Sequence, residues 1–207
     1  MKVKKIRHEK YKVLKLHLLK SRVYQTRSTK NFLNESLNQN LEQSELHIKK
    51  ALKIIYEYHS KNCKILFIGF PSSNIKLFSN LIANTQHFFI PSNLWINGLL
   101  ANQTSISQFL LGSTFSQKSR LSLKNANSLL SIKTKPDLVV IFDQSIETDT
   151  LKELYNLDIP ITFFGSKSVL NEQITYKIPG NFFFINQKVK NIISFLLCSI
   201  MKKIPRN

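Results

Sequence analysis

Residues 64–70 read KILFIGF, an apolar run that ends at Gly69 and is followed by Pro71. A short apolar run closed by Gly and Pro is typical of a buried strand and its turn. Four further runs of this kind are HFFI at 87–90, LVVIF at 138–142, IPITFF at 159–164 and ITYKI at 174–178. Strands that are apolar at nearly every position predict a parallel sheet covered on both faces.

Segments with helical periodicity alternate with these strands. Apolar residues recur at helical spacing in 41–59, 75–82, 148–157 and 185–200, and a shorter helix is expected around Ile106. This order predicts a three-layer α/β fold, flavodoxin-like or Rossmann-like, with a parallel sheet, flanking helices and right-handed crossovers. We expect a basic N-terminal arm at 1–35, a polar linker at 31–40, an α/β domain at 36–204 and, within that domain, a shortened insertion at 113–128.

The charge balance points to a polyanionic partner. The 207 residues include 30 Lys and Arg against 12 Asp and Glu, a net charge of +18, yet 43% of the residues are hydrophobic. A folded chain with this surplus is best explained by nucleic acid binding. Residues 1–30 are either a solvated tail or an arm that orders on RNA phosphates, and their dense positive charge favours the arm. The candidate RNA-binding residues are Lys2, Lys4, Lys5, Arg7, Lys10, Lys12, Lys15, Arg22, Arg27, Lys118 and Arg120.

No phosphate-binding loop follows the first strand. KILFIGF continues as PSSN, so Gly69 is the only glycine there, and neither a dinucleotide fingerprint nor a P-loop is present. Asp143 stands where parallel sheets often carry catalytic groups, with Glu147 nearby, but a loop carboxylate or helix cap is the preferred interpretation. The pattern therefore disfavours a nucleotide-dependent enzyme, and we expect no catalytic residue and no cofactor.

Cysteine and histidine spacing predicts no metal site. Cys63 and Cys198 lie far apart, and the five histidines show no ligand spacing. No apolar run approaches the roughly 20 residues that a membrane-spanning helix needs. We therefore expect no metal, no disulfide framework and no membrane span.

Three segments carry recognisable motifs in a fixed order. NLWINGLLAN at 93–102 contains Trp-x-x-Gly-x-Leu-x-Asn, PDLVVIFD at 136–143 is followed by a helix and LDIPITFF at 157–164, and YKIPGN at 176–181 precedes the last helix. Together these segments resemble the ribosomal protein S2 family, the universal second protein of the small ribosomal subunit. The matching residues are Trp95, Gly98, Leu100, Asn102, Pro136, Asp137, Asp143, Ile159, Pro160, Ile178, Pro179, Gly180 and Asn181.

The motif residues also have structural interpretations. Gly98 permits close packing or a positive φ beside Trp95, and Pro160 begins a strand, where a missing donor is tolerated. The segment 179–181 reads as a turn that aims the last helix. Trp95 is either a core anchor or a platform on which an RNA base stacks, and the anchor is preferred.

The resemblance implies a structural protein without a reaction. It implies a place on the solvent side of the small subunit near the head–body junction, in contact with ribosomal RNA and neighbouring proteins, and we expect no homo-oligomer. The chain departs from the family in its shortened helical hairpin and in its N-terminal segment. This divergence, with a composition rich in residues that have A/T-rich codons, indicates a mitochondrial version located in the matrix.

Two alternatives remain open. One is a Rossmann-like nucleotide- or RNA-modifying enzyme, which a bound nucleotide or a cleft of titratable groups near Gly69 and Asp143 would favour. The other is a non-ribosomal basic adaptor that binds free RNA or an anionic membrane. Moderate salt would wash such an adaptor off, whereas a ribosomal component would stay with the small subunit.

Overall fold

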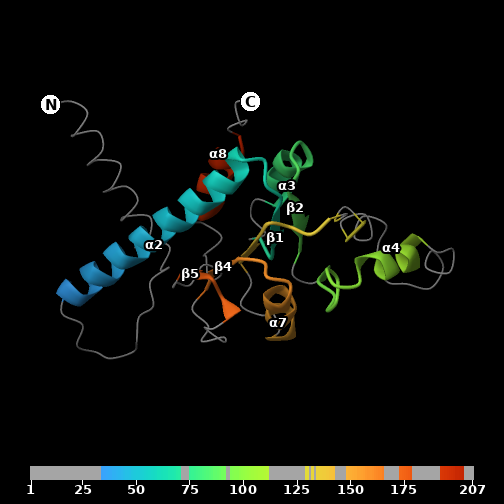
Figure 1. The fold of residues 1–207 in the computed structure, drawn as a ribbon. Coiled ribbons are helices and arrows are strands. Elements are labelled where there is room, and N and C mark those ends of the chain that lie inside the picture. The colour runs from blue at the N-terminus through green and yellow to red at the C-terminus, as the bar shows by residue number, and fades with distance from the viewer. Residues whose placement is uncertain are drawn as a thin grey trace.

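The computed structural model describes residues 34–70, 75–91, 94–111, 129–130, 132, 134–142, 148–165, 173–178 and 192–202. Within these ranges the strands are β1 (Ile65–Ile68), β2 (Phe88–Ile90), β3 (Leu138–Ile141), β4 (Ile161–Phe164) and β5 (Tyr176–Ile178). The helices are α2 (Asn34–Ser60), α3 (Ile75–Ala83), α4 (Gln103–Leu111), α7 (Thr148–Asn156) and α8 (Ile192–Met201). Helices lie on both sides of the central sheet, so the predicted α/β class is confirmed (Figure 1).

The sheet has the order β2-β1-β3-β4-β5, and every neighbouring pair is parallel. This is the flavodoxin-like order, so the structure decides between the two arrangements that the sequence left open. The chain moves outward from β1 to β2 and then in the opposite direction from β3 through β4 to β5. Because crossovers are right-handed, this reversal places helices on opposite faces. Accordingly α3 covers one face and α7 the other.

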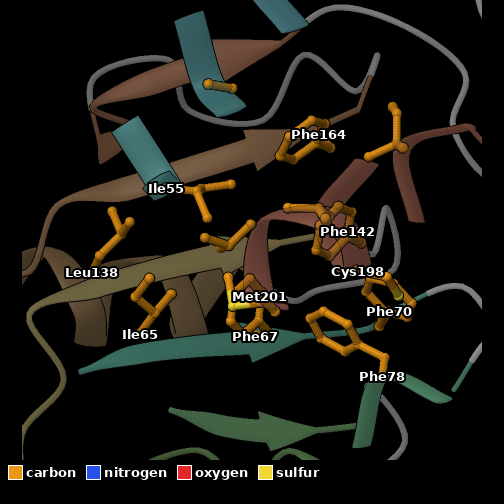
Figure 2. Close-up of a cluster of buried hydrophobic side chains, with 14 of the residues drawn as sticks. Ile55, Ile65, Phe67, Phe70, Phe78, Leu138, Phe142, Phe164, Cys198 and Met201 are labelled. Atoms are coloured by element: carbon orange, nitrogen blue, oxygen red, sulfur yellow. The ribbon is translucent and has the colours of Figure 1, made fainter. Parts of the chain in front are cut away.

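Each face of the sheet buries its own hydrophobic cluster. On the first face, Phe67 of β1 packs with Phe78 of α3 and with residues of α2 and α8 (Figure 2). On the second face, Leu66 of β1 packs with Leu151 of α7 and with residues of the 94–106 segment. Successive strand residues point to opposite faces, so a sheet covered twice needs an apolar residue at almost every position. This requirement explains the uninterrupted apolar runs in the sequence.

Helix α2 begins earlier than the sequence analysis predicted. The linker expected at 31–40 is wrong from Asn34 onward, because residues 34–40 form the first turns of α2. Leu37 and Leu41 stand four residues apart and continue the helical pattern backward, although the Asn-rich composition had indicated a linker. At its other end α2 closes with Asn62 at φ 55°, where the N–H of Cys63 donates to Tyr58 O at 3.0 Å. This left-handed residue is a common helix stop.

The other predicted elements that fall on described residues are confirmed, with ends that differ by at most two residues. Of the expected closing helix, the described part is α8, and residues 185–191 lie outside the described residues. The arm up to residue 33 and the insertion at 113–128 also lie outside them. None of the described helices combines the length and the apolar character that crossing a membrane requires.

Candidate functional site

The carboxyl ends of β1 and β3 are the position where a doubly wound sheet commonly binds its ligand. The described residues there are buried phenylalanines, since Phe70 follows β1, Phe142 follows β3 and Phe164 ends β4. The Phe78 ring stacks on Phe70 with centroids 3.9 Å apart, and Phe142 stacks on Phe164 at 4.8 Å. Figure 2 shows these rings together at the strand ends. Among the described residues, this edge supplies packing where a nucleotide site would supply polar groups.

A cleft of titratable groups near Gly69 and Asp143 is the feature that would favour the alternative of an enzyme. The N–H of Gly69 donates to Ile90 O at 3.1 Å, so this amide already has a partner. Asp143 and Glu147 lie outside the described residues. In the described part of the chain, no group of three or more His, Cys, Asp or Glu side chains could hold a metal ion. The described residues at this edge therefore show no arrangement for phosphate or metal binding.

One carboxylate fastens the Trp-x-x-Gly-x-Leu-x-Asn loop to α7. Glu153 Oε2 accepts the N–H of Gly98 at 2.8 Å, and Glu153 Oε1 accepts those of Leu100 and Ala101 at 2.9 and 3.2 Å. Gly98 has φ +81°, and a Cβ built there would lie 3.2 Å from Asn102 Nδ2. Glycine accommodates this left-handed backbone without strain, and the turn it makes lets three N–H groups converge on one carboxylate. The sequence expectation for Gly98 is thus matched by its backbone geometry.

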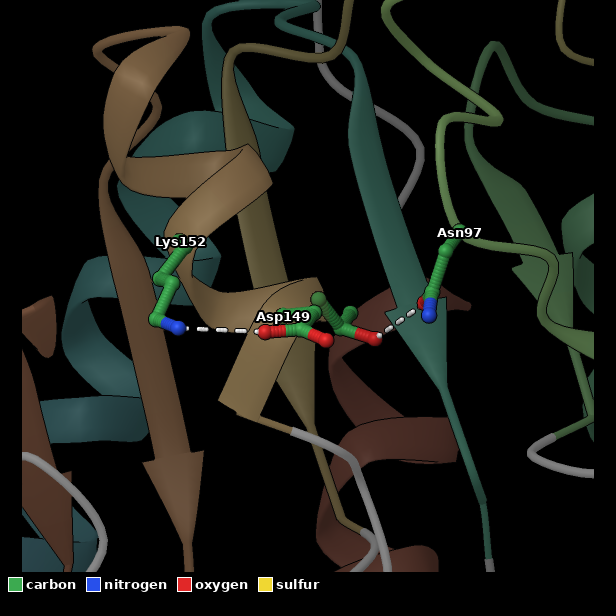
Figure 3. Close-up of polar contacts among 4 residues, drawn as sticks. Asn97, Asp149 and Lys152 are labelled. Carbon is green, nitrogen blue, oxygen red and sulfur yellow. Dashed lines mark hydrogen bonds and ion pairs between the residues drawn. The ribbon is translucent and has the colours of Figure 1, made fainter.

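A second contact joins the same loop to the same helix. Thr150 Oγ1 donates to Asn97 Oδ1 at 3.2 Å, and the Thr150 residue is 1% exposed (Figure 3). On the outer side of α7, Lys152 Nζ lies 3.1 Å from Asp149 Oδ1, with both side chains more than half exposed. An exposed pair of this kind contributes little to stability. The loop is therefore held by Glu153 and Thr150. The exposed pair of Asp149 and Lys152 lies on the same helix and does not involve the loop, so a variant of Asp149 can serve as a control for a variant of Glu153.

Trp95 is half-buried and packs against the second hydrophobic cluster. Its Nε1 is buried and has no hydrogen-bond partner among the residues that the structure describes. The neighbouring Ile96, Asn97, Ala101 and Asn102 are exposed. This packing agrees with the anchor interpretation of Trp95, while base stacking on its ring stays a prediction. The loop thus presents a small surface whose shape depends on α7.

The family-motif residues Pro136, Asp137 and Pro160 lie at the opposite, amino-terminal edge of the sheet. Asp137 Oδ2 accepts the N–H of Lys64 at 2.7 Å, and the N–H of Asp137 donates to Lys64 O at 2.8 Å. These bonds couple the residues that precede β1 and β3. Pro136 is buried, and Pro160 O accepts the N–H of Val139 at 3.0 Å. In the described structure, these residues align neighbouring strands.

Two histidines that the sequence analysis treated as scattered form a buried pair. His59 Nδ1 and His87 Nε2 are 2.7 Å apart, and the N–H of Ile65 donates to His87 Nδ1 at 3.3 Å. Because His87 Nδ1 accepts this bond, the proton of neutral His87 sits on Nε2 and points to His59. Burial and, second, the nearby His59 lower the pKa of His87 from 6.5 to about 4. The pair is a buried structural link between α2 and the residues that lead into β2.

The positive charge lies mainly outside the described residues. The described ranges contain ten Lys and Arg and eight Asp and Glu, a balance of +2 out of the chain's +18, which leaves +16 elsewhere. All predicted RNA-binding residues lie outside the described residues, namely Lys2, Lys4, Lys5, Arg7, Lys10, Lys12, Lys15, Arg22, Arg27, Lys118 and Arg120. The same holds for Pro179, Gly180 and Asn181. The described domain itself is nearly neutral.

Glu153 is the residue that the sequence analysis missed. In the sequence it stands within an ordinary helical segment, LKELYN, and its three N–H partners lie 52 to 55 positions away. No local spacing connects them. The sequence gives only an indirect indication of such an acceptor. A loop that turns at a glycine with positive φ exposes several backbone N–H groups, and these groups need an acceptor from elsewhere in the fold. The His59–His87 contact was missed for the same reason.

Comparison with known proteins places these features in a family. The family model described as Ribosomal protein S2 matches residues 16–202 and so begins inside the segment assigned to the arm. Small ribosomal subunit protein uS2 of Rickettsia canadensis (strain McKiel) is 26% identical over an alignment of 163 residues that covers 68% of this chain and 55% of that protein. The protein of the same name from Rickettsia typhi (strain ATCC VR-144 / Wilmington) is 28% identical over 163 residues. The chain thus spans little more than half the length of these relatives. The family model matches almost all residues of the chain, and the Trp95 and Pro136 motifs lie in segments that adjoin the strands of its parallel sheet. The chain therefore belongs to the ribosomal protein S2 family.

Proposed function

We propose that this chain is a structural protein of the mitochondrial small ribosomal subunit that binds small-subunit ribosomal RNA and neighbouring ribosomal proteins. The observation that carries the proposal is the family match over residues 16–202. The role involves no reaction and no cofactor. The α/β domain acts as a rigid spacer, because apolar packing fills both faces of its sheet.

The mechanism of attachment is neutralisation of phosphate charge by Lys and Arg. The surplus of +16 outside the described residues supports this assignment, since the described domain contributes only +2. Each phosphate contact releases condensed counterions, so binding weakens steeply with salt. The Lys-rich arm and the pair Lys118 and Arg120 are the segments assigned to RNA. Neighbouring proteins contact the nearly neutral domain surface.

The mitochondrial location is supported by the chain's composition and divergence. Lys, Asn, Ile and Phe, which have A/T-rich codons, are abundant, and the identity to the bacterial relatives is only 26 to 28%. The relatives reported above are named as bacterial ribosomal proteins, so the location requires its own test. That test is fractionation of cells that produce the tagged chain, followed by probing of mitochondria and cytosol.

Sucrose-gradient sedimentation of the mitochondrial lysate tests the ribosomal role. The tagged chain is expected to sediment with the small subunit and to stay there in moderate salt. Recovery only in free or membrane fractions refutes the ribosomal assignment and favours the basic adaptor. Sedimentation with small subunits outside mitochondria keeps the ribosomal role and refutes the location.

A charge-removal variant tests the arm directly. Replacing Lys2, Lys4, Lys5 and Arg7 by Gln is expected to lower the salt concentration at which the chain leaves the subunit, because up to four phosphate contacts are lost. The matched control replaces Lys49, Lys50, Lys53 and Lys61, which are exposed in the described structure, by Gln. Equal effects of the two variants contradict a specific role for the arm.

A further inference from the structure

A cavity whose lining includes a carboxylate, a side-chain amide and an aromatic ring opens at the amino-terminal edge of the sheet. The buried phenylalanines lie at the opposite, carboxyl-terminal edge. The cavity has a volume of about 340 Å³ and lies between the end of α7 and the residues that lead into β4 and β5. The lining residues are Tyr155, Asp158, Ile159, Pro160, Gln173, Ile174 and Thr175. None of these lining residues carries a positive charge. This cavity belongs to neither the motif loop nor the proposed RNA-binding segments.

Two lining groups are acceptors without a side-chain partner among the described residues, and an exposed aromatic residue lines the same cavity. Gln173 Oε1 is buried and accepts no hydrogen bond from them. The Asp158 carboxylate forms no ion pair with any described residue, and Asp158 is exposed. Tyr155, which is 55% exposed, is the aromatic residue of the lining. A buried acceptor without a donor is costly, so a ligand that supplies an N–H group relieves that cost.

The backbone at the end of α7 places Asp158 at this cavity. Asp158 has φ 53°, and the N–H of Ile159 donates to Leu154 O at 3.2 Å, which makes Asp158 the left-handed residue that stops α7. Glycine is the usual residue at this position, and Asn and Asp are the other residues that adopt its left-handed conformation routinely, so Asp158 ends α7 as Asn62 ends α2. The end of α7 thereby brings the Asp158 carboxylate to the cavity, beside Tyr155 and Gln173.

We infer that this cavity binds an arginine side chain of a neighbouring ribosomal protein. A guanidinium group has five N–H donors and no acceptor, which matches a carboxylate and an amide oxygen, and it stacks on an aromatic ring such as Tyr155. RNA phosphate is disfavoured, because the lining offers a negative charge to an anion. The inference rests on the proposed ribosomal function for the identity of the partner but not for the chemistry of the cavity.

The chemistry is tested on the purified full chain by NMR titration with N-acetyl-arginine amide. Saturable shifts at Gln173 and Thr175 are expected, and N-acetyl-norleucine amide, which has no charge, should give none. Asp158→Asn should weaken binding about threefold to tenfold, and Gln173→Glu should strengthen it by about the same factor, since both change the charge facing the ligand. Asp149→Asn removes an equal charge from the first turn of α7, outside the cavity, and should change nothing. Absence of saturable shifts, or equal loss in the Asp149 and Asp158 variants, overturns the inference.

The partner is tested by placing p-benzoyl-phenylalanine at Tyr155 and irradiating purified small subunits. A cross-link to a peptide of another protein that contains arginine supports the inference, provided that Asp158→Asn reduces its yield. A cross-link to RNA, to residues 1–33 of this chain or to nothing overturns it for a chain that sediments with the subunit. A chain that fails to sediment with the subunit refutes the proposed function instead, and the titration still decides the chemistry of the cavity.

Discussion

Replacing Glu153 by alanine removes the common acceptor of three backbone N–H groups in the motif loop. The bonds to Gly98 and Leu100 are 2.8 and 2.9 Å long, and the bond to Ala101 is 3.2 Å. A hydrogen bond to a charged group contributes about 1.5–3 kcal/mol. Gly98 and Leu100 are half-buried and Ala101 is exposed, so water replaces part of the loss. We expect the free energy of unfolding to fall by about 2–4 kcal/mol.

Urea unfolding of the purified chain measures this loss, and the single tryptophan reports on the loop itself. With an m-value of about 2–3 kcal/mol/M, the midpoint should shift by about 1 M. Trp95 lies in the loop that Glu153 holds. In the Glu153→Ala variant, its fluorescence should therefore change at a lower urea concentration than the far-UV circular dichroism signal, which reports on the whole fold. Asp149→Ala is the matched control on α7, because its exposed pair with Lys152 is expected to contribute about 0.5 kcal/mol or less.

Two results would refute this reasoning. If Glu153→Ala and Asp149→Ala cost the same, the three N–H bonds do not fasten the loop. If Glu153→Ala is strongly destabilising but fluorescence and circular dichroism still change together, the loop is not a separately released unit. In that case Glu153 stabilises α7 and the sheet as a whole.

Further changes test the histidine pair, the motif glycine and the aromatic cluster. As the pH falls from 6.5 to 4, the free energy of unfolding should decrease by up to about 3 kcal/mol, because His87 takes up a proton near pH 6.5 in the unfolded chain and only near pH 4 in the folded chain. In His87→Asn the side-chain Oδ1 can still accept the N–H of Ile65. This variant should therefore flatten that part of a plot of urea midpoint against pH. Gly98→Ala should cost about 1–2 kcal/mol in urea unfolding, since φ is +81° and the added Cβ meets Asn102, and a smaller loss would show that the loop relaxes. Phe78→Ala should cost about 3–5 kcal/mol, because this ring is fully buried, and an unchanged midpoint would contradict the packing at the carboxyl edge.

The sequence was sufficient to predict the fold class, because the signal for each element is local. The runs at 65–68 and 138–142 are apolar at every position, and a sheet buried on both faces leaves such a run in any chain that forms one. The helix at 34–40 was missed because the Asn-rich composition of that stretch resembles a linker, while its Leu37–Leu41 spacing is a weaker signal. Local composition and local periodicity conflicted there, and periodicity was the better guide.

The candidate site was predictable only in part. Trp95 and Gly98 stand close together in the sequence, so their motif could be recognised without a structure. Their acceptor Glu153 could not, because a hydrogen bond across more than 50 residues leaves no periodic trace in the sequence. The same limit applies to the cavity beside Asp158, whose lining comes from two separate segments.

The amino-acid sequence by itself determined the alternation of strands and helices, the excess of Lys and Arg, and the ordered motifs of the ribosomal protein S2 family. Only the tertiary structure decided the strand order β2-β1-β3-β4-β5, the burial of phenylalanines at the carboxyl edge and the pairing of His59 with His87. The physical reason is the range of the forces involved. Backbone preference and amphipathic spacing act over a few residues, whereas register and side-chain partners depend on contacts that exist only once the chain has folded.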